Sequence, residues 1–145
     1  MEEKKLDVDI SSILVVNELD IETELSYCAS HYYRFASLAD EAELIAQKCK
    51  LDLEVFEVQL AKDIRKQLLE DGYKADKITE SEVKREFRSN KLWLALKNKA
   101  IDAECDHKKL EKAAKGFDIK SQNCMSLNKR QLYKASKGMI RQEDL

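Results

Sequence analysis

The chain has 145 residues, of which 37% are charged and 43% hydrophobic, with three glycines and no proline. So few turn-forming residues argue against a β-sheet fold with its tight turns and long loops, and the length suits a single helical domain over residues 1–145. We therefore expect an all-α protein. The apolar share suffices for seams between helices but is small for one thick core, which favours an elongated or oligomeric molecule.

The net charge of −2 conceals an uneven distribution along the chain. Residues 1–60 hold 5 basic and 14 acidic residues, whereas residues 61–145 hold 21 basic and 14 acidic ones. Between residues 84 and 141 there are 16 basic and 6 acidic residues. An acidic half and a basic half can attract each other between subunits, or the basic half can bind phosphate groups.

The first residues do not resemble a secretion signal, because the only nearby apolar run, Ile13–Val16, is short and has acidic neighbours. No stretch approaches the roughly 20 apolar residues of a membrane span. We expect a cytoplasmic protein that does not enter a membrane and keeps its cysteines reduced. Residues 1–19 are expected to form a flexible arm or a clip onto a neighbouring subunit.

The longest helical pattern covers residues 25–71, which contain neither glycine nor proline. The sequence predicts a helix that begins near Asp20, a good N-cap, and ends before Gly72. An apolar stripe with steps of three and four residues runs along it: Leu38, Ala42, Ile45, Cys49, Leu53, Phe56, Leu60 and Ile64. These steps close an eleven-residue cycle, which predicts nearly straight or slightly right-handed packing.

A second helix is predicted after the break at Gly72. Thr79 and Glu82 have the spacing of a capping box, in which each side chain can bond a free backbone N–H at a helix start. The two helices are expected to form a long antiparallel hairpin, with the second running from about residue 80 to 115. Gly116 is expected to end it, and a further C-terminal helix is predicted over residues 118–137.

Basic residues gather around the predicted turn, with Phe87 and Trp93 between them. Basic side chains can bind phosphates, and aromatic rings can stack on unpaired bases without reading their sequence. The alternative is that the basic residues form the solvated face of the helices and the aromatic rings lie in the core. The candidate nucleic-acid-binding residues are Lys62, Arg65, Lys66, Tyr73, Lys74, Lys77, Lys84, Arg85, Arg88 and Lys91.

Two further basic blocks, over residues 108–115 and 120–141, can extend such a surface or contact the acidic half of another subunit. Cys28 with His31, and Cys105 with His107, are poorly spaced for a closed zinc site. Counted from a turn near residue 76, Cys28 and Cys124 fall at similar levels of the hairpin, as do Cys49 and Cys105, and buried thiols are expected. Since no catalytic motif is present, we expect neither an enzyme nor a cofactor.

Several short segments occur in a recognisable order. Tyr27, Tyr32 and Tyr33 open a long helix rich in alanine and acidic residues, which ends in Ile64–Leu69 before the glycine turn. Ile78–Val83 follows, and then a basic helix. In this order the chain resembles small bacteriophage recombination proteins, and most of all the recombination mediators of the UvsY type, over about residues 20–140.

The resemblance implies a protein without enzymatic activity that self-associates into rings and binds single-stranded DNA. It also implies a role in loading a RecA-like recombinase onto DNA coated by a single-strand-binding protein. Glu70 and Asp71 depart from the family, which tends to have aromatic residues there. A helical adaptor or structural protein that binds no nucleic acid stays the alternative. The residues that match the family's DNA-binding stretch are Lys62, Arg65, Lys66, Gly72, Tyr73 and Lys74.

Overall fold

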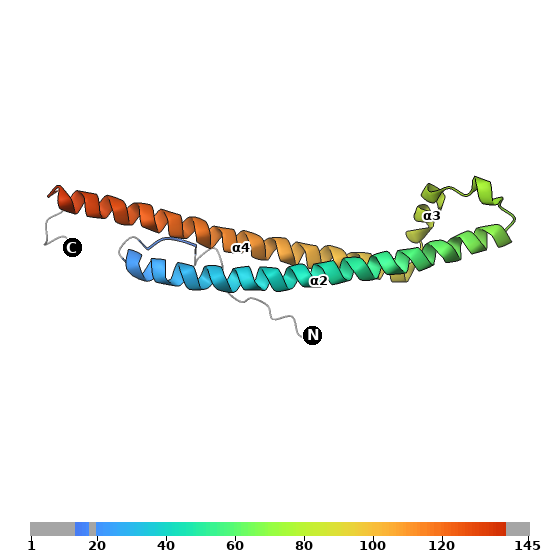
Figure 1. Ribbon diagram of the computed structural model, residues 1–145, viewed down its shortest axis with the longest axis horizontal. Coiled ribbons are helices and arrows are strands. Elements are labelled where there is room, and N and C mark those ends of the chain that lie inside the picture. The colour runs from blue at the N-terminus through green and yellow to red at the C-terminus, as the bar shows by residue number, and fades with distance from the viewer. Residues whose placement is uncertain (1–13, 18–19, 139–145) are drawn as a thin grey trace. The chain divides into compact units, whose positions relative to one another are not determined.

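The computed structural model describes residues 14–17 and 20–138. Within these residues the protein is all-α, and its two long helices pack antiparallel as a hairpin, as predicted (Figure 1). Most of the proposed N-terminal arm, residues 1–13 and 18–19, lies outside the described residues. The elements are α2 (Ile21–Glu70), the 3₁₀ helix η1 (Ala75–Lys77), α3 (Glu80–Phe87) and α4 (Lys91–Ser136).

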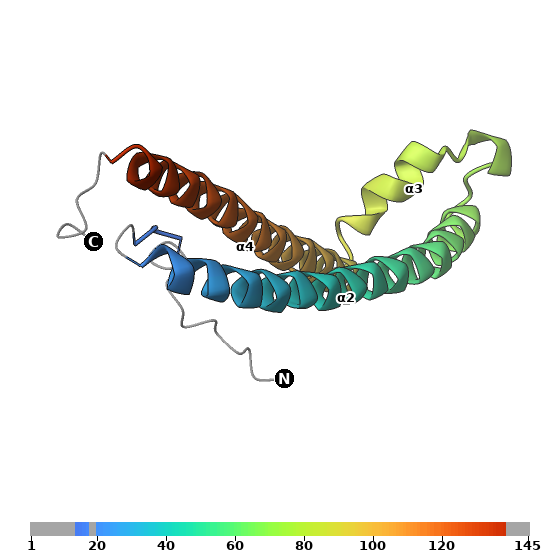
Figure 2. The same cartoon turned by 60° about the vertical axis from the view of Figure 1, so that its left-hand side comes forward.

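The chain groups into two compact units, each containing a part of both long helices (Figure 2). Unit 1 combines α2 up to Ala39 with α4 from Lys109 onward. Unit 2 is the continuous segment Asp40–Lys108, and therefore includes the turn between the long helices, η1 and α3. We describe the two units separately.

Both ends of α2 lie where the sequence predicts them. Asp20 caps the helix, since its Oδ1 accepts a hydrogen bond from the Thr23 amide at 3.4 Å. At the other end Gly72 has a φ of 92°, a conformation that a residue with a Cβ rarely adopts. The Gly72 amide donates to the Leu69 carbonyl and the Tyr73 amide to the Leu68 carbonyl, which is the Schellman pattern of a helix stop.

The prediction of one continuous helix over residues 80–115 is wrong, because the helix breaks between Phe87 and Lys91. Thr79 does cap a helix, because its Oγ1 accepts from the Glu82 amide at 3.3 Å, but this helix, α3, ends at Phe87. Asn90 then caps α4, its Oδ1 accepting from the Trp93 amide at 3.0 Å. The Ser89 hydroxyl donates to a carbonyl of α3 at 2.7 Å. These two polar side chains satisfy the backbone at the break in place of a continuous helix.

The predicted helix end at Gly116 is also wrong, since α4 continues through this residue to Ser136. The predicted C-terminal helix over residues 118–137 is therefore the last part of α4. The side chain of Leu14 lies against Gly116, so that a Cβ at this position would be 3.1 Å from both Leu14 δ carbons. Glycine here makes room for Leu14 inside unit 1, and does not end a helix.

The buried residues of α2 follow a seven-residue repeat, which corrects the predicted eleven-residue one. Ile45 of the predicted stripe is 51% exposed. Seven-residue spacing is typical of left-handed helix pairs, as in coiled coils. The less exposed positions of α4 follow the same steps of three and four, from Trp93 to Asn128. The buried residues of α2 are Ile21, Cys28, Phe35, Ala39, Ala42, Ala46, Cys49 and Leu53.

Unit 1 has an aromatic core between α2 and α4. The Phe117 ring is fully buried and stacks on Phe35 and on His31, with ring centroids 5.2 and 5.1 Å apart. Ala113 and Ala114 complete the buried cluster, and Leu14, Ala36, Leu38 and Leu110 pack against it. The large rings and the adjacent alanines fill the seam between the helices. Among the described residues, every buried side-chain nitrogen or oxygen atom has a hydrogen-bond partner.

Next to this core an ion pair joins the two helices of unit 1. Lys120 of α4 is 6% exposed and bonds to Glu24 of α2. Cys28 and Cys124 lie beside the pair, next to each other and almost fully buried, as predicted. The expectation of buried thiols is wrong for Cys105, which is exposed. Burial raises the pKa of the Cys28 thiol above its ordinary value of 9.0, although the Lys120 ammonium acts in the opposite direction.

Candidate nucleic-acid interface

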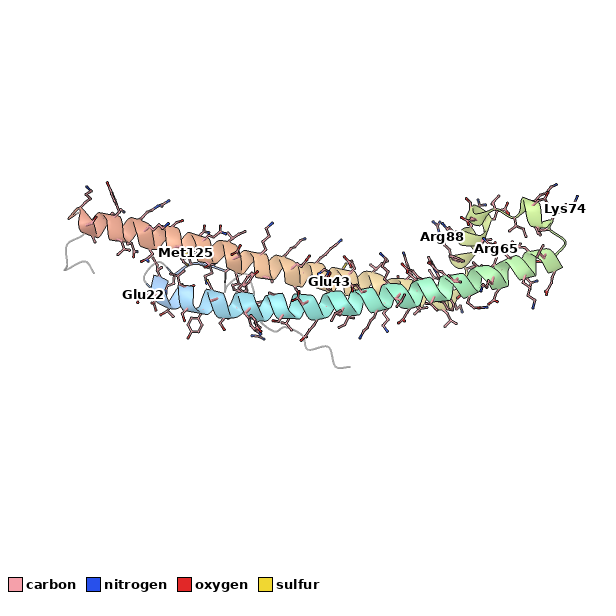
Figure 3. The ribbon with its side chains drawn as sticks, in the orientation of Figure 1. Glu22, Glu43, Arg65, Lys74, Arg88 and Met125 are labelled. Atoms are coloured by element: carbon pink, nitrogen blue, oxygen red, sulfur yellow. The ribbon has the colours of Figure 1, made fainter. Side chains whose placement is uncertain are left out.

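The ten candidate residues all lie in unit 2, around the turn between the long helices, and all are exposed. They come from the end of α2, from η1 with its flanking loop, from α3 and from the start of α4. Figure 3 shows Arg65, Lys74 and Arg88 at this end of unit 2. We call the set the turn surface: Lys62, Arg65, Lys66, Tyr73, Lys74, Lys77, Lys84, Arg85, Arg88 and Lys91.

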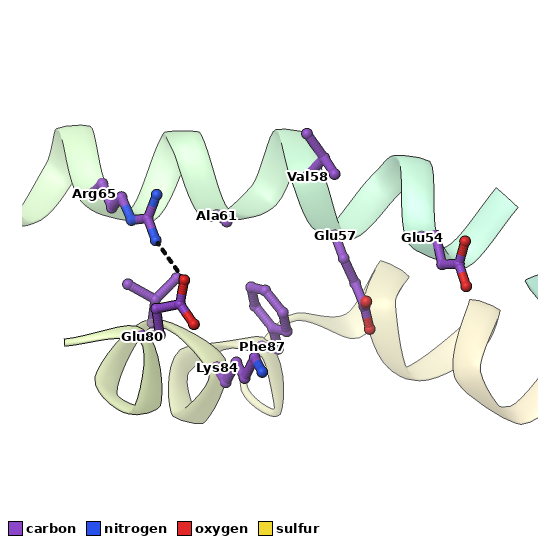
Figure 4. Close-up of a pocket in the computed structure, with 9 residues that line it drawn as sticks. Glu54, Glu57, Val58, Ala61, Arg65, Glu80, Lys84 and Phe87 are labelled. Atoms are coloured by element: carbon purple, nitrogen blue, oxygen red, sulfur yellow. Dashed lines mark ion pairs between the residues drawn. The ribbon is translucent and has the colours of Figure 1, made fainter. Parts of the chain in front are cut away.

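A groove of about 390 Å³ separates α3 from α2 beside this surface (Figure 4). Three carboxylates and two basic side chains line it, and Arg65 Nη2 lies 3.9 Å from Glu80 Oε1. The excess of carboxylates makes the groove itself unsuitable for a phosphate. Phosphate contacts would have to come from side chains of the turn surface that point away from this groove. The groove is lined by Glu54, Glu57, Val58, Ala61, Arg65, Glu80, Val83, Lys84 and Phe87.

The charge of the turn surface is mixed. Residues 62–91 contain nine basic and seven acidic residues, so the local excess of positive charge is small. On α3 the separation is clearer, because the first turn carries Glu80 and Glu82 and the last turn carries Lys84 and Arg85. Arg88 follows α3, with Glu86 between it and Arg85. Residues 84–88 therefore hold three basic residues and one acidic one, the same balance as residues 62–66 at the end of α2.

Of the two aromatic residues between the basic ones, Phe87 is buried in the core of unit 2 and Trp93 is half-buried beside it. Phe87 is 7% exposed, and its ring centroid lies 6.1 Å from that of Trp93. The indole N–H of Trp93 donates to Glu57 Oε1 at 2.9 Å. The Phe87 ring cannot stack on a nucleic-acid base in this arrangement, and the Trp93 ring is held by Phe87 and Glu57, which favours the alternative that places these rings in the core. Tyr73, 55% exposed, is the aromatic residue that the turn surface offers.

The two other basic blocks, over residues 108–115 and 120–141, differ in exposure. Lys108, Lys109, Lys112 and Lys115 are exposed on α4. Lys120 is buried in its ion pair with Glu24 and so does not belong to an exposed basic surface. Arg141 lies outside the described residues. Of the later block, the exposed members within α4 are Lys129, Arg130 and Lys134.

Two residues at the edge of the turn surface were not anticipated from the sequence. Asn90 sets the start of α4, and Glu57 fixes the Trp93 ring from a position 36 residues away. A signal for Asn90 exists, since Ser-Asn before an apolar segment is typical of a helix start. Glu57 gives no local signal, because its partner comes from another helix.

The described residues contain no group of three or more His, Cys, Asp or Glu side chains that could hold a metal ion. His31 stacks on Phe117, and Cys28 is buried against Cys124, so these two residues, whose spacing is poor for a zinc site, take part in packing. None of the helices described combines the length and the apolar character that a membrane span requires. No protein-family model, no curated protein and no solved structure matches the chain significantly.

Proposed function

We propose that the chain binds single-stranded DNA through the turn surface, without sequence specificity, as a recombination accessory protein. The observation that supports this most is that ten basic or aromatic side chains are all exposed at one end of unit 2. They come from four helical segments, α2, η1, α3 and α4, and from the loops between them. Flexible lysine and arginine side chains bind phosphates wherever these lie along a strand. Tyr73 adds a ring on which one base can stack.

The role as a mediator rests on the resemblance to the UvsY type. In that role the protein would hold single-stranded DNA while a RecA-like recombinase replaces the single-strand-binding protein. Self-association would strengthen the binding, because each subunit adds a basic surface at high effective concentration. Weak individual sites would then hold a strand firmly.

Fluorescence anisotropy with a labelled oligonucleotide, at about 50 and 200 mM salt, tests the DNA-binding proposal. Replacing Lys84, Arg85 and Arg88 together by Ala should reduce affinity about tenfold or more at the lower salt. The slope of log affinity against log salt should become shallower by about 0.7 for each phosphate that the variant no longer neutralises. The corresponding triple variant at Lys62, Arg65 and Lys66 should act in the same direction.

A control variant with Lys129, Arg130 and Lys134 replaced by Ala removes the same charge from α4 in unit 1. It should retain most of the affinity, and circular dichroism should show equal helix content in all variants. An equally weakened affinity in the control would move the site away from the turn surface. No change in the Lys84/Arg85/Arg88 variant would refute the assignment of these residues.

A second candidate function is a helical adaptor that assembles with proteins and binds no nucleic acid. The seven acidic residues among residues 62–91 favour it, because they offset most of the positive charge. A second observation in its favour is the row of exposed apolar side chains on α2. If the wild-type protein fails to bind the oligonucleotide even at low salt, the adaptor is the better description.

A further inference from the structure

Unit 2 carries a second apolar stripe, on the exposed side of α2. Leu44, Leu51, Val55 and Val58 are 59%, 58%, 64% and 59% exposed. Their spacing of seven, four and three residues is that of a helix seam, although α4 does not cover them. Lys48 occupies the seam position between Leu44 and Leu51, so the apolar row is interrupted once. Scattered exposed apolar residues need no explanation, but four exposed apolar residues at seam spacing mark an interaction surface.

The stripe faces away from α4. Leu44 and Leu51 follow the buried residues Ala42 and Cys49 by two positions, which is about 200° around a helix. Val58 continues the row and is 59% exposed, although it also lines the groove between α2 and α3 (Figure 4). The stripe is therefore open on the side of α2 opposite the covered seam, and borders the groove with α3 at Val58.

The two ends of the stripe have opposite charge. Continued at the same spacing, it reaches Glu41 at its N-terminal end, and Lys62 and Arg65 at its C-terminal end. Asp40 and Glu43 surround Glu41, and Lys66 follows Arg65, so an acidic end and a basic end are separated by a mainly apolar stretch that contains Lys48. Such a surface is complementary to itself when one copy is reversed.

We propose that this stripe binds the same stripe of a second copy of the chain, with the two α2 helices antiparallel. In the register that best overlaps the apolar residues, Leu51 faces Val55 of the second copy, and Lys48 faces Val58. Toward each end of the interface, Leu44 of one copy contacts the aliphatic stem of Lys62 of the other, and Glu41 of one copy faces Arg65 of the other. Each of these pairs occurs twice in the dimer.

The opposite, parallel arrangement is disfavoured by charge. If two parallel α2 helices are aligned at the same residue numbers, each charged residue of the stripe faces the identical residue of the other copy. This gives four like-charge contacts, at Glu41, Lys48, Lys62 and Arg65. The antiparallel arrangement replaces two of these by opposite-charge pairs. Arg65 is free to take part, because its contact with Glu80 is 3.9 Å long between exposed side chains and contributes little.

The interface does not depend on DNA binding, and can be tested without nucleic acid by sedimentation equilibrium of the full chain. The wild type should approach twice its mass of 16.8 kDa as concentration rises. Leu51→Glu and Val55→Glu should each weaken association about tenfold or more, because a carboxylate would enter the apolar seam. Leu92→Glu, at a residue 67% exposed on α4, is the matched control and should leave association unchanged.

A charge exchange tests the orientation. Glu41→Arg and Arg65→Glu should each weaken association, and the double variant should restore it, since each pair is then re-formed in reverse. A monomeric wild type at every concentration, an equal effect of Leu92→Glu, or failure of the double variant to recover would each overturn the proposal. DNA affinity, measured on the Lys84/Arg85/Arg88 variant, is read separately because these residues lie outside the stripe.

Discussion

At the scale of single residues, Lys120 shows how one contact changes the meaning of a charge. In the sequence it belongs to a basic block, whereas in the structure it is 6% exposed and paired with Glu24. A buried ammonium is costly unless a carboxylate and further hydrogen bonds compensate it. The pair therefore favours the one alignment of α2 and α4 in unit 1 that brings these two side chains together.

Glu24→Gln should destabilise the protein by about 1.5–3 kcal/mol, because the buried ammonium loses its anionic partner while the shape of the side chain is kept. Urea unfolding followed by circular dichroism measures this. Glu22→Gln, at an exposed position in the same helical turn, is the control and should change stability by less than about 0.5 kcal/mol. Equal effects of the two variants would mean that the pair contributes nothing specific.

The four cysteines should differ in reactivity. Cys105 is exposed, whereas Cys28, Cys49 and Cys124 are buried, so a thiol reagent should modify Cys105 first in the native protein. Mass spectrometry during alkylation would show one fast modification at Cys105 and three slow ones that accelerate in urea. In Cys105→Ser the fast modification should disappear. Rapid native alkylation of Cys28 would contradict the buried arrangement.

The raised pKa of Cys28 also predicts a dependence of stability on pH. The unfolded thiol ionises near its ordinary value of 9.0, at lower pH than the folded one, so the free energy of unfolding decreases as the pH rises past that value. The stability contributed by the protonated thiol is complete below that pH and decreases as the pH rises toward the folded pKa. Cys28→Ser should reduce this alkaline destabilisation in urea titrations at pH values from about 8 to 10. An unchanged pH profile would exclude Cys28 as its source.

At the scale of elements, the helix ends that were predicted correctly depend on local chemistry. Asp20, Gly72 and Thr79 each act on backbone groups within a few residues, so their sequence signals are sufficient. Gly116 misled the prediction because its role depends on Leu14, about a hundred positions away. A glycine that stops a helix and one that admits a neighbouring side chain look the same in a sequence.

The break at Asn90 carries a prediction of its own. Asn90→Ala removes the acceptor for the Trp93 amide, and should cost about 1 kcal/mol of stability measured by chemical unfolding. Asn98→Ala is the control, because Asn98 is exposed within α4 and alanine is a better helix former there. We expect the control to be neutral or slightly stabilising. A greater destabilisation in the control than at Asn90 would argue against the cap.

The repeat of α2 could not be assigned from the sequence because this helix has apolar residues on more than one face. The eleven-residue stripe combined covered positions such as Cys49 and Leu53 with the exposed Ile45. Packing against α4 selects the face with alanine and cysteine, whose small side chains allow close approach of two helices. Composition favoured the larger apolar residues, but several of these, including Leu44 and Leu51, remain exposed.

At the scale of the whole molecule, the all-α class and the antiparallel hairpin were predictable, whereas the candidate site was only partly so. Exposure of the basic residues follows from their chemistry, but the core position of Phe87 and Trp93 depends on contacts with α2. The removal of Lys120 from the basic surface likewise needed its partner in space. Residue types identified the candidates, and tertiary contacts decided which of them are exposed.

The position of Trp93 has a practical consequence for studying this chain in solution. It is the only tryptophan in the sequence, and its indole is held between Phe87 and Glu57, entirely within unit 2. Its fluorescence should therefore follow the unfolding of unit 2 alone. Thiol protection at Cys28 and Cys124 follows unit 1 in the same sample. Tryptophan fluorescence and thiol alkylation can thus distinguish one cooperative transition from two.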